Sequence, residues 1–258
     1  IRKLAYHFPY YFATVFGAAL SIILIFMFER YLEASIFVNY FKSYVVFQVS
    51  LILLELGGYT KLQQYIKIDS KSNNIGISLI AFQNVIFLTL SLILLVKEGV
   101  IFASFFMIQA LLYSNYIWYY TAIDKEKSYY LILIIFRILI VITSLLLIFG
   151  INILPFLILL MLGKIITIIT SEKWKIEEFF SDLLFFFKLN KSVGATNLVT
   201  QIGNRFIDIS IFQVFPEKEL IRIGLLKPIL DRLGSMITQH IVNREMIRSA
   251  KNLSPFGY

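Results

Sequence analysis

Cysteine is absent from the sequence, and charged residues are scarce. None of the 258 residues is cysteine, and the four charged residue types together make up 16%, whereas about 25% is usual for a soluble domain. The lack of cysteine excludes a disulfide scaffold, thiolate catalysis and cysteine-based zinc sites. The low charge and the high apolar content exclude intrinsic disorder.

The sequence is rich in apolar residues. They make up 59% of the sequence and aromatic residues 16%, and the mean hydropathy is +0.79. A soluble fold of this size has too little interior to bury so many apolar side chains. The composition therefore predicts an all-α, polytopic transmembrane helix bundle, in which about 20 residues per span allow roughly eight crossings.

Continuous apolar runs mark the expected spans. Each run is close to the length that a helix needs to cross about 30 Å of hydrocarbon. The runs cover Phe8–Phe28, Ile36–Leu56, Ile75–Val96, Gly99–Tyr120, Tyr129–Phe149, Ile151–Thr170 and Val193–Phe215. An eighth segment, residues 220–246, contains Lys227, Pro228 and Asp231, and is either a kinked span or an amphipathic surface helix.

The pattern divides the chain into three regions. Residues 1–171 are expected to form a first six-helix transmembrane lobe, and residues 193–258 the start of a second transmembrane lobe. Between them, residues 172–192 combine charged residues with Phe and Leu at helical spacing. This composition predicts an amphipathic linker that lies in the membrane interface.

Basic residues in the connections predict the orientation. The side of the N-terminus carries most of them: Arg2, Lys3, Lys61, Lys67, Lys71, Lys125, Lys127, Lys173, Lys175, Lys188 and Lys191. The opposite side carries Arg30, Lys97 and Lys218. We therefore expect a cytoplasmic N-terminus. Basic inner loops beside an anionic leaflet also account for the net charge of +8 without a nucleic-acid partner.

Ionisable residues inside a bilayer are costly and usually functional. Lys42, Arg137 and Lys164 are cationic candidates in the first lobe, and Arg205 is one in the second. Lys42 and Lys164 could instead reach an interface with their long stems. If the four converge, they form an electropositive cavity suited to a phosphate or pyrophosphate group, because Arg grips phosphate oxygens bidentately and Lys acts as a point charge.

The seventh expected span carries a wide polar stripe. Its polar residues recur every four positions in two adjacent rows. They are Thr196, Thr200, Asn204 and Asp208 in one row and Asn197, Gln201 and Arg205 in the other. Lipid cannot satisfy these groups, so the stripe is either a helix interface joined by polar contacts or the wall of an aqueous cavity. Arg205 and Asp208 are spaced so that they could neutralise each other.

Polar and small residues also occur in other spans. Those that could complete a cavity are Gln48, Gln83, Asn84, Gln109, Ser114 and Asn115. Ala13, Gly17 and Ser21 form a small-residue stripe on the first span, which we interpret as a helix-packing face.

Enzyme signatures are missing from the sequence. It has no Gly-rich phosphate-binding loop and no serine in a nucleophile elbow, and His7 and His240 are too far apart for a helical metal pair. We therefore expect a protein that is not an enzyme and that needs neither a metal nor another cofactor.

Several segments resemble one transporter family. The stretch from Phe28-Glu29-Arg30-Tyr31 to Leu54-Glu55-Leu56-Gly57-Gly58-Tyr59 looks like that family's second span and its exit. The stretch from Ile202-Gly203-Asn204-Arg205-Phe206-Ile207-Asp208 to Ile223-Gly224-Leu225-Leu226 is similar to the start of its second lobe, and Tyr120 to Lys127 to its fourth-to-fifth loop. The chain thus resembles the polysaccharide (O-antigen or capsule, Wzx-type) flippases of the multidrug/oligosaccharidyl-lipid/polysaccharide exporter superfamily. Such exporters have about twelve or more spans in two lobes, so the resemblance covers a first lobe and the opening of a second.

The resemblance implies a function and a location. The chain would be a multi-pass protein of the bacterial inner (plasma) membrane that flips a polyprenyl-pyrophosphate-linked oligosaccharide from the inner to the outer leaflet by alternating access. A polysaccharide polymerase and other assembly proteins would be its partners.

The resemblance also gives roles to the intramembrane polar residues. Four cationic side chains would attract the pyrophosphate: Lys42, Arg137, Lys164 and Arg205. Sugar hydroxyls or waters would be hydrogen-bonded by Thr200, Gln201 and Asn204. Asp208 would balance Arg205 or respond to a coupling proton.

Two other functions stay open. A cation-coupled small-molecule (drug) exporter needs carboxylates in the membrane, for which Asp208 and Glu55 are the candidates. A non-transporting membrane scaffold of a polysaccharide assembly complex would not depend on the intramembrane cations.

Overall fold

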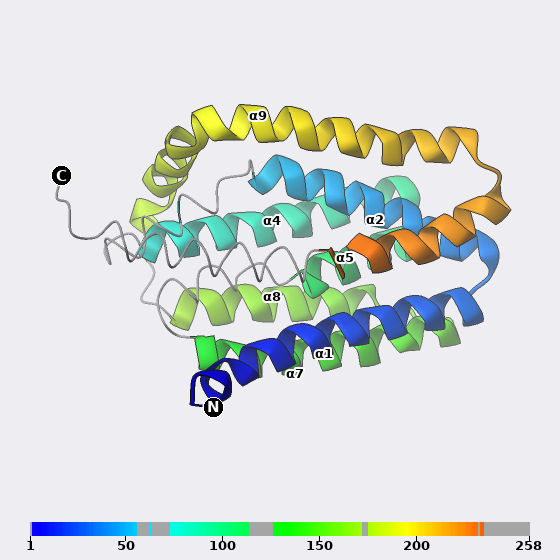
Figure 1. Ribbon diagram of the computed structural model, residues 1–258, viewed down its shortest axis with the longest axis horizontal. Helices are drawn as coiled ribbons and strands as arrows, with labels where there is room; N and C mark the ends of the chain where they lie inside the picture. Colours follow the sequence, from blue (N-terminus) through cyan, green and yellow to red (C-terminus); the bar gives the residue numbers. More distant parts are fainter. Residues whose placement is uncertain are drawn as a thin grey trace.

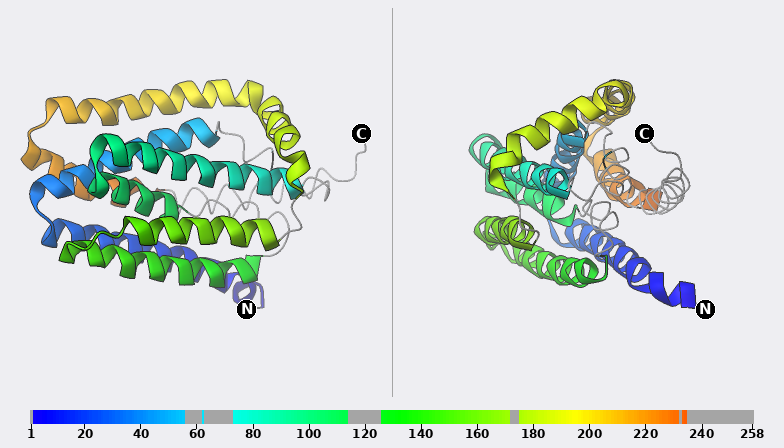
Figure 2. Two further views of the ribbon diagram at one scale, coloured as in Figure 1. Left: turned by 180° about the vertical axis from the view of Figure 1, so that it is seen from behind. Right: turned by 90° about the vertical axis from the view of Figure 1, so that its left-hand side faces the viewer.

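The computed structural model describes residues 2–55, 62, 73–113, 126–171, 175–231 and 233–234. All regular structure in these ranges is helical, which confirms the all-α expectation for the described part of the chain. Figure 1 and Figure 2 show the helices side by side in an elongated bundle. Successive long helices run in opposite directions along it.

The helices follow the expected spans closely in most of the chain. Their bounds are α1 (Arg2–Tyr31), α2 (Ala34–Glu55), α4 (Asn73–Glu98), α5 (Val100–Leu112), α7 (Glu126–Leu145), the 3-10 turn η2 (Leu146–Phe149), α8 (Leu154–Ser171), the 3-10 turn η3 (Ile176–Glu178) and α9 (Phe179–Val214). A last helix covers residues 217–231.

Two described helices are long and apolar enough to cross a membrane, namely Ala34–Leu54 and Asn74–Glu98. Val100–Leu112, Ile134–Phe149 and Leu154–Thr167 are shorter apolar helices. Two such helices are modest support for a membrane protein, because the core helix of a soluble protein can have the same length and composition.

Glycine and asparagine form two tight connections between helices. Gly99 and Gly150 adopt positive φ angles of 91° and 74°, a region that side-chain-bearing residues rarely enter. The N–H of Gly150 donates to the carbonyl of Leu147, closing η2. Two residues later, the side-chain oxygen of Asn152 accepts a hydrogen bond of 3.2 Å from the N–H of Leu154 and caps α8.

The fourth expected span, Gly99–Tyr120, is not one continuous helix. α5 ends at Leu112, and Tyr113 has an extended backbone with φ −70° and ψ 112°. The 13 residues of α5 extend over about 20 Å at 1.5 Å per residue, and Figure 1 shows the helix ending part-way along the bundle. Residues 114–120 lie outside the described residues.

The expected linker and the seventh span form a single helix. α9 runs through 36 residues from Phe179 to Val214, so the predicted boundary between residues 192 and 193 falls inside it. Figure 1 shows that the N-terminal part of α9 bends away from the rest of the helix.

The eighth expected segment begins with a described helix. Pro216 precedes it, and its carbonyl accepts hydrogen bonds from the N–H groups of Glu219 and Leu220 at 3.0 and 3.1 Å. The helix continues from residue 217 through the buried Pro228 to residue 231. It folds back from the end of α9 toward the middle of the bundle (Figure 1).

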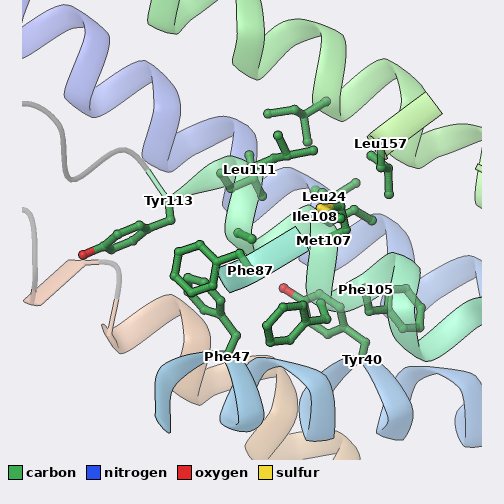
Figure 3. Packing of buried hydrophobic residues seen from close by; sticks show 14 of the residues in the cluster. Leu24, Tyr40, Phe47, Phe87, Phe105, Met107, Ile108, Leu111, Tyr113 and Leu157 are labelled. Carbon is green, nitrogen blue, oxygen red and sulfur yellow. The ribbon is translucent and has the colours of Figure 1, made fainter. Parts of the chain in front are cut away.

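The short helix α5 forms the centre of the core. It packs against α2, α4 and α8, and its side chains from Phe102 to Leu112 are buried. Figure 3 shows the rings of Phe47 and Phe87 together beside it, with their centroids 5.3 Å apart. The ring of Tyr113 packs edge-on against Phe47 at 5.7 Å. Aromatic side chains thus fix the end of α5.

Candidate functional site

A buried arginine lies where α1 packs along α7. Arg137 is near the middle of α7 and is 7% exposed. A β-carbon on Gly17 of α1 would overlap the Nη1 atom of Arg137. The guanidinium therefore occupies the space that a side chain at position 17 would need. Gly17 and Ser21 are both buried, which confirms the packing face at these positions, whereas the side chain of Ala13 lies outside the described residues.

A second basic residue lies on a helix next to that of Arg137. Lys164 is a partly buried residue of α8, and its Nζ donates a hydrogen bond of 3.3 Å to the main-chain carbonyl of Tyr113. This carbonyl follows the C-terminus of α5, where a helix carries partial negative charge. Because α7 and α8 contact each other and both pack against α5, the structure places two of the four basic residues that the sequence singled out on adjacent helices.

Of the other two predicted cations, one is exposed and the other has a side chain outside the described residues. Lys42 is exposed on α2, between the buried residues Phe41 and Ser43. Arg205 lies in α9, but its side chain is outside the described residues. Its part in the cationic cluster therefore stays a prediction.

The polar stripe of the seventh span is only partly described. Thr200, Gln201 and Asn204 belong to α9, and their side chains lie outside the described residues. The side chain of Asp208, on the same stripe, is described and is 5% exposed. The choice between a polar helix interface and a cavity wall therefore depends on Asp208 and its neighbours.

Asp208 belongs to a charged network that joins three helices. Its Oδ1 lies 3.2 Å from Nζ of Lys227 in the helix over residues 217–231. Lys227 also contacts Asp231, one turn further along, at 3.4 Å. The hydroxyl of Tyr44 in α2 donates a hydrogen bond of 2.7 Å to Oδ2 of Asp231. Lys227 is therefore a described partner of Asp208, whereas the expected neutralisation by Arg205 involves a side chain that is not described.

The sequence analysis did not predict the contacts of Lys227, Asp231 and Tyr44 in this network. Lys227 and Asp231 stand at i and i+4 on one helix, a spacing that favours an ion pair, and this signal was available. The pairing of Lys227 with Asp208 depends on how the last helix folds back on α9. No pattern in the sequence identifies Tyr44 among the 15 tyrosines.

Buried amides occur where α4 packs against α5. Gln83, Asn84 and Gln109 are at most 1% exposed. The side-chain amide of Asn84 donates to the carbonyl of Ile80 in its own helix at 2.8 Å. These residues were expected to complete a cavity, and the structure places them inside the packed core. Ser114 and Asn115 lie outside the described residues.

The start of α9 is bound to the start of α4 by polar contacts. The hydroxyl of Ser78 donates to Oδ2 of Asp182 at 2.7 Å. The side-chain amide of Asn74 donates to Oε2 of Glu178 at 3.0 Å, and Lys175 pairs with Glu178 at 3.2 Å. These contacts hold the N-terminal part of α9 against the bundle.

The two carboxyl groups in this contact have opposite pKa shifts. The largest effect on Asp182 is burial, which raises the pKa of its carboxyl group. The hydrogen bond from Ser78 lowers this pKa, and the negative charge of Glu178 raises it further. The hydrogen bonds from Asn74 and Lys175 lower the pKa of Glu178. Burial thus favours the protonated form of Asp182, whereas the hydrogen bonds favour the charged form of Glu178.

No group of three or more His, Cys, Asp or Glu side chains that could hold a metal occurs within the described residues. The Arg137–Lys164 pair can attract an anion through charge and hydrogen bonds. No protein-family model, curated protein or solved structure matches the chain.

Proposed function

We propose that the chain is a multi-pass membrane transporter that moves a polyprenyl-pyrophosphate-linked oligosaccharide from the inner to the outer leaflet. It would work by alternating access in the bacterial inner membrane. The observation that carries the proposal is the presence of two basic residues, the buried Arg137 and the partly buried Lys164, on adjacent helices of an apolar bundle.

The apolar composition and the alternating helix directions support a membrane location with seven to eight spans. In this arrangement α1, α2, α4, α7 and α8 cross the bilayer, as do the C-terminal part of α9 and the expected fourth span, of which α5 is the described part. The helix over residues 217–231 begins the eighth span, and the N-terminal part of α9 lies in the inner interface. The bias of basic residues places the N-terminus in the cytoplasm.

Like charges held close together support an anionic substrate. Arg137 and Lys164 repel each other across a low-dielectric interior, and an anion between them turns this repulsion into attraction. A pyrophosphate suits both partners, because the guanidinium can bind two of its oxygens and the ammonium a third. Lys42 and Arg205 are assigned to the path that leads the phosphate groups to this pair.

Roles for the remaining polar residues follow from the same proposal. Thr200, Gln201 and Asn204 would hydrogen-bond the sugars as they pass α9. Asp208 would keep its charge balanced through Lys227, to which it is paired. A polymerase and other polysaccharide assembly proteins would act on the product.

Binding to the purified chain tests the anion site directly. We would measure the affinity for polyprenyl pyrophosphate, polyprenyl monophosphate and uncharged polyprenol in nanodiscs. We expect the pyrophosphate to bind best and the alcohol worst, and binding to weaken with added salt. Arg137→Ala and Lys164→Ala should each weaken pyrophosphate binding about tenfold, which corresponds to roughly 1.4 kcal/mol.

Arg222→Ala is the matched control. Arg222 is an exposed arginine paired with Glu219 at 3.6 Å, so its removal takes away the same charge without touching the site. Equal binding of the alcohol and the pyrophosphate, or equal losses in Arg137→Ala and Arg222→Ala, would refute the anion site.

Transport requires a second experiment. Proteoliposomes that contain the chain and a fluorescent lipid-linked oligosaccharide report flipping through a quencher added outside. We expect faster loss of fluorescence than in protein-free vesicles, and slower loss with Arg137→Ala. Normal pyrophosphate binding without flipping would favour the scaffold of an assembly complex.

A cation-coupled small-molecule exporter is the second candidate. It is favoured by the two carboxylates, Asp208 and Asp231, that converge on Lys227, since coupling ions need carboxylates in the membrane. In a drug-resistance assay with an imposed sodium or proton gradient, Asp208→Asn should then abolish gradient-dependent resistance. Arg137→Ala should leave resistance unchanged in that case.

A further inference from the structure

Two adjacent faces of α2 contact different parts of the molecule. On one face, Tyr40 and Phe47 belong to the main core around α5. On the other, Phe41, Tyr44 and Val45 form a separate buried cluster. That cluster packs against Ile211 and Phe212 of α9 and against Ile223 of the last helix. α2 therefore joins the first lobe to the start of the second.

The apolar half of this contact is close-packed. The rings of Phe41 and Phe212 lie 5.0 Å apart. A β-carbon on Gly224 would lie 2.9 Å from Cβ of Phe41, which is closer than a β-carbon comes to an atom of another residue. Glycine at position 224 thus allows the last helix to lie directly on α2.

The polar half includes, among the described residues, one hydrogen bond between the lobes and two ion pairs within the second lobe. Tyr44 donates to Asp231 across the contact. Lys227 pairs with Asp231 and Asp208, and so ties the last helix to α9. Separation of the lobes breaks the hydrogen bond of Tyr44 but leaves both carboxylates paired with Lys227, so these charges keep an ionic partner.

Two members of the network are not fully enclosed by the described helices. The side chains of Lys227 and Asp231 are 25% and 29% exposed, whereas that of Asp208 is 7% exposed. In an aqueous cavity between the lobes, a released polar group would replace its lost hydrogen bond at little cost. The contact can thus open and close while Asp208 and Lys227 remain an ion pair.

We propose that the contact of Tyr44 and Phe41 with Asp231 and Gly224 is a latch between the two lobes. It is closed in this structure and opens once in each transport cycle. The opening step rests on the proposed function, because alternating access is what requires the lobes to separate.

The absence of cysteine makes a cross-linking test direct. In the double variant Phe41→Cys and Gly224→Cys, the two β-carbons are near enough for a disulfide after a shift of less than about 1 Å. Oxidation should stop flipping of the fluorescent lipid-linked oligosaccharide, and a reductant should restore it. The pair Val46→Cys and Gly224→Cys is the control, since Val46 is 37% exposed on α2 and should not cross-link.

Two results would overturn the latch without touching the proposed function. One is unchanged flipping by fully cross-linked protein. The other comes from a measurement that needs no substrate: Val45 is 3% exposed, and a maleimide should label Val45→Cys at least several-fold faster once Tyr44→Phe is added. Labelling of Val46→Cys should not change. If Tyr44→Phe leaves the labelling of Val45→Cys unaltered, there is no latch, whether or not the chain transports lipid-linked sugars.

Discussion

At the scale of single residues, Arg137 is held by the backbone of a neighbouring helix. Moving a charge out of water costs several kcal/mol, so a buried arginine needs a fixed position. Gly17 supplies it, because the guanidinium lies where a side chain on α1 would begin. The position of the cation thus depends on a residue that has no side chain.

Gly17→Ala tests this dependence. The added methyl group would overlap Nη1 of Arg137, so we expect α1 and α7 to be pushed apart or the guanidinium to be displaced, at a cost of about 1–3 kcal/mol. Thermal unfolding in detergent should show a lower midpoint, and pyrophosphate binding should weaken.

Gly163→Ala is the control for this substitution. Gly163 lies in α8 beside Lys164, and a β-carbon there would meet nothing within 4 Å. It should leave binding unchanged and raise stability by up to about 1 kcal/mol through helix propensity. In the background of Arg137→Ala, Gly17→Ala should lose most of its effect. Persistence of the full effect there would show that the guanidinium is not what Gly17 accommodates.

The pH dependence of stability tests the Asp182 contact. Burial raises the pKa of Asp182 above its ordinary 3.8, so folding favours the protonated form. The stabilisation is complete below 3.8 and is lost as the pH rises through the raised pKa. Glu178 acts in the opposite sense, because its pKa is lowered, so that its contribution is lost as the pH falls.

Asp182→Asn separates these opposing effects. The amide cannot ionise, so the loss of stability on raising the pH from about 4 to about 8 should be smaller than in the unmodified chain. Unfolding midpoints across this range measure it. Ser181→Ala, at an exposed neighbour, should keep the original profile. An Asp182→Asn profile parallel to that of the unmodified chain would contradict the raised pKa.

From the sequence, single residues could be chosen by type and position, but their neighbours in space could not be derived. Arg137 and Lys164 were identified because ionisable residues in apolar runs are rare. Their closeness could not be derived, since it depends on how α7 and α8 pack in three dimensions. The partner of Asp208 was assigned to the nearest cation along the helix, Arg205, whereas the structure adds Lys227 from a neighbouring helix.

At the scale of elements, apolar runs predicted where helices lie better than where they stop. α2 and α4 begin and end within a few residues of the expected spans. α5 stops at Leu112 inside an apolar and aromatic run, because Tyr113 leaves the helix to pack on Phe47. α9 continues through the expected linker boundary because helical geometry tolerates a change from amphipathic to apolar composition. The end of α5 is therefore set by a tertiary contact, which cannot be recognised from the local composition.

The turn at Gly150 gives a prediction at this scale. Its φ of 74° lets η2 end and α8 begin, which sets the position of Lys164. Gly150→Ala should lower stability by about 1 kcal/mol, because a β-carbon disfavours this conformation. Gly150→Asn should be milder, since asparagine tolerates left-handed backbone. Unfolding midpoints of both variants check the order, and equal losses would point to a cause other than the backbone.

At the scale of the whole molecule, the alternating helix directions gather the connections at two ends of the bundle. One end contains the turns from α1 to α2, from α4 to α5 and from α7 to α8, and the start of the last helix (Figure 1). The other contains the starts of α4, α7 and α9 and the end of α8. The sequence predicted this alternation from span lengths and basic residues, and the proposed membrane orientation assigns the second end to the cytoplasm.

Labelling of single cysteines tests this orientation, because the chain has none of its own. Glu33, Lys97 and Lys218 are exposed residues of the first end, and Lys175 and Glu177 of the second. In spheroplasts, a membrane-impermeant maleimide should label cysteines at the first three positions at once, and those at the last two only after the membrane is permeabilised. The charge bias of the loops is the physical reason. Labelling of all five in intact spheroplasts would place the bundle outside the bilayer. A mixture of fast and protected sites within one end would mean that the helices do not cross in alternation, and the transport proposal would lose the two-sided geometry it requires.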